Sequence, residues 1–245
     1  MEKYFSREFQ LTSNDVNLEI LQHTVGDVGC VVWDAALVLG AYLDHMNQTG
    51  QIPYPAVFYW DLVLAQALLV WLLQHLGRSH VILIITGLPL QDTKCYLLSR
   101  GDCLMTDLPE MVPLIKRNLF KNTPLLQGAG SAKAFEWGSD MSGLVSHTDK
   151  GFDIVLAADC IYYKESLNAF IKTIEDLSSH SNEGTKTEIF ISYEDRESEE
   201  KKTLIADFFE RIKKSCCVSK VPYEHYRNDF RCEDIHIFKI TSLKT

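Results

Sequence analysis

The chain has 245 residues and a formal charge of −9, so it is long enough to bury the core of one large domain. Its acidic balance argues against a protein that follows nucleic-acid phosphates and favours a basic substrate or partner. The seven cysteines contain no paired CxxC arrangement of the kind that holds zinc, and they predict a reducing, cytoplasmic setting. No targeting signal is evident. No repeat or proline-rich linker divides the chain, so we expect a single domain over residues 1–245.

The predicted elements begin with NLEILQHT, residues 17–24, whose loose alternation predicts one strand of an N-terminal hairpin. The run GDVGCVVWD then ends at Asp34, a residue typical of a helix N-cap, and residues 35–46 follow as a helix. Residues 57–77, VFYWDLVLAQALLVWLLQHLG, form the most apolar stretch. Its continuous part, residues 57–73, is interrupted by Asp61 and Gln66, and its roughly 17 residues fall short of the roughly 20 apolar residues of a membrane span. We therefore expect its printed residues to favour a core helix.

Strand and helix patterns alternate from residue 107 to the end. An amphipathic helix follows Asp107, with apolar residues at helical spacing: Met111, Leu114, Ile115 and Leu119. Residues 154–158 form an apolar run typical of a strand buried on both faces. A helix at residues 166–177, a strand in TEIFISYEDR, a helix in EEKKTLIADFFERIKKS and an antiparallel strand in EDIHIFKI complete the series. This is the order of a doubly wound α/β sheet.

In such sheets ligands bind beyond the carboxyl ends of the strands, which gives three candidate positions. Asp107 can accept both ribose hydroxyls of an adenosine-containing cofactor, or it can cap the helix after it. In DCIYY, Asp159 and the following tyrosines can face a substrate, or they can serve as a helix cap and buried aromatics. The pair Tyr193 and Glu194 marks the third position.

Several motifs together resemble the seven-β-strand protein-lysine methyltransferases, the family 16 methyltransferase-like proteins, and within them those that act on valosin-containing protein, an AAA ATPase. The motifs are GDVGCVVWDAALVL, TDLPEM, FEWG, DIVLAADCIYYKESL, ISYEDR and EDIHIFKI, which cover most of the chain outside residues 50–105. The resemblance implies a Rossmann-like seven-stranded fold that uses S-adenosylmethionine and methylates a lysine of a protein substrate. We also expect a monomer that binds neither nucleic acid nor membranes and needs no metal.

Carried over residue by residue, the resemblance places five residues at the cofactor. Trp33 would border it, Asp107 would bind its ribose and Trp137 would flank its adenine, while Ala158 and Tyr163 would complete the pocket. Without the resemblance, both tryptophans fit core positions equally well.

Asp159 and Tyr162 match the DxxY signature that, in the family, faces the target lysine. Methyl transfer to an amine is an in-line displacement, so the enzyme mainly aligns donor and acceptor. An exposed Asp159 carboxylate, with a pKa far below that of lysine, would attract and orient the amine rather than act as a strong base.

The family also has a Gly-rich turn of the type LELGAGTGxxG before Asp107, and this chain has no glycine between Gly50 and Gly77. Read one base earlier, a message for residues 59–78 can encode LGLGAGTGVVGLVAATLGA. Residues 80–83, HVIL, would join TDLPEM as the second strand if residues 84–105 were absent. We therefore expect residues 58–105 to be aberrant, as a frame-shifted stretch plus an insertion that disrupts the first strand and the Gly-rich loop.

Two functions follow from these patterns. The first is a protein-lysine methyltransferase; the second is a catalytically impaired product that acts only as a substrate-binding protein. A small-molecule or nucleic-acid methyltransferase on the same fold is a third interpretation, which the acidic charge and the absence of an NPPY-like turn disfavour.

Overall fold

The computed structural model describes residues 4–11, 16–23, 34–49, 82–86, 102–109, 112–122, 130–145, 152–180 and 186–243. An N-terminal hairpin pairs β1 (Tyr4–Leu11) with β2 (Val16–His23) in antiparallel register, which confirms the strand predicted in NLEILQHT. The backbone N–H of Leu21 donates to Oδ1 of Asn118 at 3.1 Å, so a hydrogen bond fixes the hairpin to the helix that carries Asn118.

A second, mixed sheet forms the centre of the molecule, with the order β5-β4-β3-β6-β7-β9-β8. Its strands are β3 (Ile82–Thr86), β4 (Asp102–Asp107), β5 (Gly130–Ala134), β6 (Ile154–Ala158), β7 (Glu188–Glu194), β8 (Cys216–Lys220) and β9 (Ile235–Ser242). β4 is parallel to β5, and β6 is parallel to β7. β3 runs antiparallel to both β4 and β6, so these two share one direction. The carboxyl ends of β4, β5, β6 and β7 therefore lie at the same edge of the sheet.

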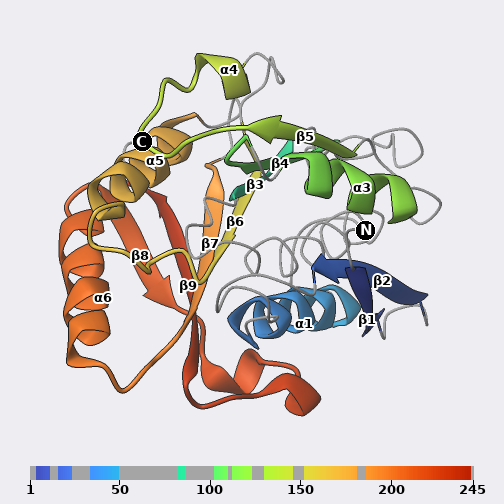
Figure 1. The fold of residues 1–245 in the computed structure, drawn as a ribbon. Helices are drawn as coiled ribbons and strands as arrows, with labels where there is room; N and C mark the ends of the chain where they lie inside the picture. The colour runs from blue at the N-terminus through green and yellow to red at the C-terminus, as the bar shows by residue number, and fades with distance from the viewer. Residues whose placement is uncertain are drawn as a thin grey trace, which may run out of the picture.

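Helices lie on both sides of this sheet, as expected for a doubly wound α/β structure (Figure 1). On one side are α1 (Asp34–Gln48) and α3 (Val112–Asn122), and on the other are α5 (Leu167–Ser179) and α6 (Glu199–Ile212). A single turn, α4 (Ser142–Val145), follows β5. The helices predicted at residues 35–46 and 166–177 and in EEKKTLIADFFERIKKS are confirmed. Asp34 lies inside the first turn of α1 instead of preceding it.

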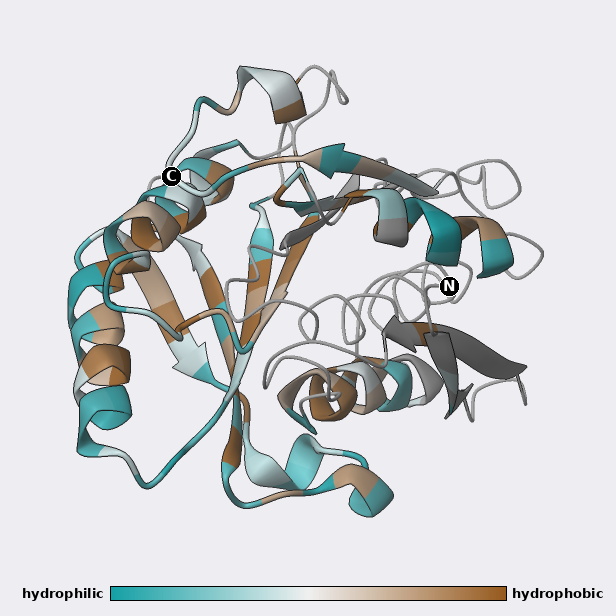
Figure 2. Ribbon diagram, viewed as in Figure 1, coloured by the Kyte–Doolittle hydropathy of each residue, from teal (hydrophilic) through white to brown (hydrophobic). Residues whose placement is uncertain are grey.

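The core lies between the sheet and these helices. Every residue of β6 is buried, as the apolar run at residues 154–158 predicted, and β7 buries its five inner residues. α5 and α6 bury apolar side chains at helical spacing, and their charged residues are exposed or partly exposed, so each helix presents one apolar stripe to the sheet. Figure 2 shows brown, apolar segments along β6 and β7.

α1 is tied to the segment between β8 and β9, which carries two short 3-10 helices, η3 (Tyr223–His225) and η4 (Asn228–Phe230). Arg227 pairs with the fully buried Asp44 of α1 at 3.1 Å. The Tyr226 hydroxyl accepts the backbone N–H of Ile237 at 2.7 Å. β9 is antiparallel to both β7 and β8, which confirms the antiparallel strand predicted in EDIHIFKI.

The segment predicted to be aberrant is only partly described. Residues 59–78, for which we predict a frame shift, lie outside the described residues, and so does the whole apolar stretch at residues 57–77. Residues 82–86 form the central strand β3, and residues 102–107 form β4 as a separate antiparallel neighbour. No helix among the residues described is long and apolar enough to cross a membrane.

Candidate functional site

Acidic side chains gather where the parallel strands end. Asp107 is the last residue of β4, Asp159 directly follows β6, and Glu194 is the last residue of β7. The pairing of Ala158 with Ser192 places the ends of β6 and β7 side by side. Because β3 is antiparallel, its first residue, Ile82, pairs with Thr106, and the chain enters β3 at this same edge.

Asp107, at the end of β4, accepts hydrogen bonds from the residues around it. Its side chain is fully buried, and Oδ1 accepts the backbone N–H of Leu108 at 2.6 Å. Its carbonyl accepts the N–H of Phe135 at 2.8 Å, which joins the end of β4 to the segment after β5. α3 begins only at Val112, so Asp107 does not occupy the helix-cap position that was its alternative role.

The turn after β6 is built around the backbone of Asp159. Its φ of 53° lies in the left-handed region, which Asp tolerates better than most side chains. Its N–H donates to the carbonyl of Ser192 at 2.8 Å, so the turn continues the pairing of β6 with β7. α5 begins at Leu167 after an N-cap at Ser166, and this position excludes Asp159 as the cap of that helix.

The Asp159 carboxylate is buried beside a cation. Its side chain is 11% exposed, and Oδ2 accepts from Nη2 of Arg196 at 2.9 Å. The backbone N–H of Glu194 approaches Oδ1 at 3.4 Å. Burial raises the pKa of Asp159 to about 6, although Arg196 acts to lower it. The sequence-based expectation of an exposed carboxylate is therefore wrong, but the pKa still lies far below that of a lysine amine.

Two tyrosines and a lysine form a wall next to Asp159. The rings of Tyr162 and Tyr163 meet edge to face with centroids 4.5 Å apart. Nζ of Lys201 lies 3.4 Å from the centroid of the Tyr162 ring and also donates to the Tyr162 carbonyl. Tyr163 is 37% exposed, so these aromatic residues are not simply part of the core. The face of an electron-rich aromatic ring attracts an ammonium group.

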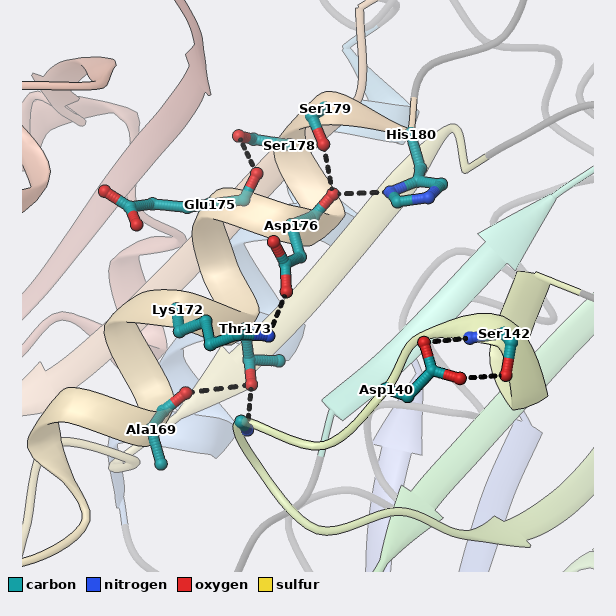
Figure 3. A network of polar contacts seen from close by, with 11 residues as sticks. Asp140, Ser142, Ala169, Lys172, Thr173, Glu175, Asp176, Ser178, Ser179 and His180 are labelled. Atoms are coloured by element: carbon teal, nitrogen blue, oxygen red, sulfur yellow. Dashed lines mark hydrogen bonds and ion pairs between the residues drawn. The ribbon is translucent and has the colours of Figure 1, made fainter.

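Trp137 lies in the segment after β5, packed against α5. Its side chain is only 5% exposed and contacts the Phe170 ring with centroids 4.5 Å apart. The next residue, Gly138, has a φ of 79° and donates its N–H to Oγ1 of Thr173 at 2.8 Å. Figure 3 shows this contact between the loop and α5, where Thr173 also donates to the carbonyl of Ala169. The loop that carries Trp137 is therefore fixed to α5.

The structure brings most of the predicted site residues to one edge. Asp107, Ala158, Asp159 and the two tyrosines lie at or just beyond the strand ends, whereas Trp33 lies outside the described residues.

One candidate does not belong to the site. Tyr193 is buried against Phe209 and Phe238, with ring centroids 6.0 and 5.9 Å away, so it is a core residue. Sequence reasoning missed two cations, Arg196 and Lys201. The position of Arg196 two residues after a strand end was a usable signal, whereas nothing in the sequence pairs Lys201 with Tyr162.

Comparison with known proteins adds the family. The profile described as "Lysine methyltransferase" matches residues 12–215. Protein-lysine N-methyltransferase EFM6 of Saccharomyces cerevisiae is 29% identical over 145 residues, which cover 56% of this chain and 53% of that protein. Protein N-lysine methyltransferase METTL21A of Danio rerio is 24% identical over 98% of this chain and 89% of its own length. The METTL21A protein of Mus musculus is 26% identical over 86% of this chain and 77% of its own length.

Proposed function

This chain belongs to the lysine methyltransferase family, and we propose from that membership that it transfers methyl groups from S-adenosylmethionine to a lysine of a protein substrate. For the substrate we propose an AAA ATPase, valosin-containing protein, and for the setting the cytoplasm, with the chain acting as a monomer. We assign it one Rossmann-like domain over residues 1–245, in which residues 58–105 depart from the family pattern.

One observation carries the proposal. At the end of β6, next to the buried Asp159 carboxylate, the ring of Tyr162 holds an ammonium group 3.4 Å from its centroid. An acidic side chain and an aromatic face at a strand end are the two groups that a lysine acceptor requires, because one attracts its charge and the other fits its nitrogen and carbon stem.

The described residues fit the adenosine part of S-adenosylmethionine. Asp107 ends β4 with a buried carboxylate, which suits a ribose, and Ala158 and Tyr163 lie beside the turn after β6. In our proposal Trp137 flanks the adenine from the segment after β5, and Trp33 borders the cofactor. When bound, the cofactor supplies an electrophilic methyl group on a sulfonium.

The chain's own groups orient the acceptor. The Asp159 carboxylate draws the target ammonium toward the edge of the sheet, and the Tyr162 ring holds the lysine side chain in line with the donor. With a pKa of about 6, Asp159 is ionised at neutral pH and is too weak a base to keep a lysine proton, so that proton leaves to water.

A second function has its own support. The family's Gly-rich turn lets the backbone approach the cofactor, and the chain has no glycine between Gly50 and Gly77. A chain without this turn would keep the acceptor site around Asp159 and lose catalysis. It would then act as a substrate-binding protein.

Thermal unfolding with and without S-adenosylmethionine separates the two functions. A ligand that binds only the folded state at about 100 times its Kd stabilises it by about 2.7 kcal/mol, so an enzyme shows a higher Tm. Asp107→Ala should lose this shift, and Asp207→Asn, on an exposed site of α6 that pairs with Arg211, should keep it. An unchanged Tm of the unaltered chain would support the substrate-binding protein and refute the enzyme.

A further inference from the structure

We propose that Lys201 is a methyl acceptor in cis, so that the chain methylates its own α6 at this residue. The proposal rests on the proposed methyltransferase function and names a substrate within the chain itself. Its basis is the position of the Lys201 amine, which lies on the ring of Tyr162, where the proposed function places the acceptor lysine.

Three contacts define the position of Lys201. Nζ lies 3.4 Å from the Tyr162 ring centroid, 5.7 Å from that of Tyr163, and donates to the Tyr162 carbonyl. The ammonium thus sits on the aromatic wall, and Lys201 is partly buried. Asp159 is near enough for its charge to act on Lys201.

Lys201 makes these contacts, whereas the neighbouring Lys202 of α6 does not. α6 begins at Glu199 after an N-cap at Ser198, so Lys201 lies in the first helical turn. A cation there opposes the helix dipole, whereas Glu199 and Glu200 agree with it. The neighbouring Lys202 points elsewhere: it is exposed and pairs with Glu199 at 3.1 Å. The ring and the carbonyl of Tyr162 therefore offset the unfavourable interaction of Lys201 with the helix dipole, and Lys202 has no such contacts among those described.

The chemistry requires a neutral amine. Burial lowers the pKa of Lys201, and Arg196 lowers it further, while Glu200 and Asp159 act in the opposite direction. The ammonium first gives a proton to water. The Nζ lone pair then forms the new bond to the methyl carbon of S-adenosylmethionine, and the carbon–sulfur bond breaks with its electron pair left on sulfur as a thioether. The methylated nitrogen can keep the Tyr162 ring as its partner.

Mass spectrometry of the purified chain after incubation with S-adenosylmethionine tests this inference. We expect methyl groups on Lys201 and none on Lys202, at a rate per chain that does not change on dilution, because the acceptor belongs to the same molecule. Lys201→Arg should abolish self-methylation, and Lys202→Arg should leave it unchanged. Methylation at other lysines with Lys201 unmodified would overturn the proposal.

The same preparation separates this inference from the proposed function. If the cofactor raises the Tm and a separate protein substrate is methylated while Lys201 stays unmodified, only self-methylation fails. If neither the Tm shift nor any transfer occurs, both fail.

A measurement without cofactor examines the amine directly. Competitive labelling with acetic anhydride over a pH series should give a lower midpoint for Lys201 in the folded chain than in the chain unfolded in urea, because burial lowers the pKa of Lys201 and only the neutral amine reacts. Equal midpoints would contradict the assignment of Lys201 as the prepared nucleophile.

Discussion

Asp159 combines a left-handed backbone, a buried carboxylate and a cationic partner. The pattern DCIYY at the end of an apolar strand identified the residue and its position, since a strand end predicts an accessible edge. Its burial and its contact with Arg196 depend on β7, which is distant in the sequence, and no local pattern reports them. Its role as an orienting carboxylate stays a prediction, and its pKa is nearer to neutrality than expected.

The raised pKa of Asp159 predicts a pH-dependent stability. Folding moves this pKa from 3.8 to about 6, so between these values the native state holds a proton that the unfolded chain has released. The free energy of unfolding therefore falls as pH rises through this window, by about 3 kcal/mol for this group. Asp159→Asn cannot titrate, and Asn tolerates the left-handed backbone.

Urea unfolding of both chains from pH 4 to pH 7 checks this prediction. The unaltered chain should lose stability relative to Asp159→Asn over that range, since all other titrating groups are common to both. A constant difference between the two chains would show that the pKa of Asp159 is not raised.

The segment between β5 and α4 illustrates packing at the scale of an element. Gly138 has a φ of 79°, and a Cβ at this position would lie 3.1 Å from Cβ of Ala169 on α5. The loop can therefore approach α5 only because residue 138 is glycine. This close approach allows Gly138 to bond Thr173 and Trp137 to reach Phe170.

Gly138→Ala should lower the free energy of unfolding by roughly 1–3 kcal/mol, because the left-handed backbone and the contact with α5 both resist a side chain. Gly143→Ala is the matched control, since its Cβ would meet Nζ of Lys133 at an ordinary 3.6 Å. Chemical denaturation measures both variants. Equal stabilities of the two variants would show that the loop is not held closely on α5.

Elements with a clear apolar run or apolar periodicity could be predicted from the sequence, whereas elements without such a pattern could not. β6, α5 and α6 carry continuous or periodic apolar residues, and their burial follows those patterns. β5 has the residues GSAKA, all exposed or partly exposed, and β8 buries only Cys216. Such short edge strands offer neither an apolar run nor a clear alternation, so pairing with neighbours decides their conformation.

At the scale of the whole molecule, the centre of the sheet departs from a uniform parallel arrangement. β3 occupies the position between β4 and β6 and runs against both. The family pattern expects at this point a strand that ends in a Gly-rich turn, and the printed residues 59–78 lack it. The direction of β3 depends on pairing between distant segments, so local periodicity could not predict it. The coding nucleotides test the frame shift directly.

Methyl transfer to valosin-containing protein by the purified chain is the most direct test of the proposed function. It is measured with S-adenosylmethionine at pH 8, where Asp159 is ionised. We expect methylation of a lysine of that protein. For Asp159→Asn we expect the rate to fall by at least about a hundredfold, because this variant keeps the turn but loses the charge that aligns the amine. A chain that binds the cofactor and transfers no methyl group to a protein lysine, or one whose rate is unchanged by Asp159→Asn, would contradict it.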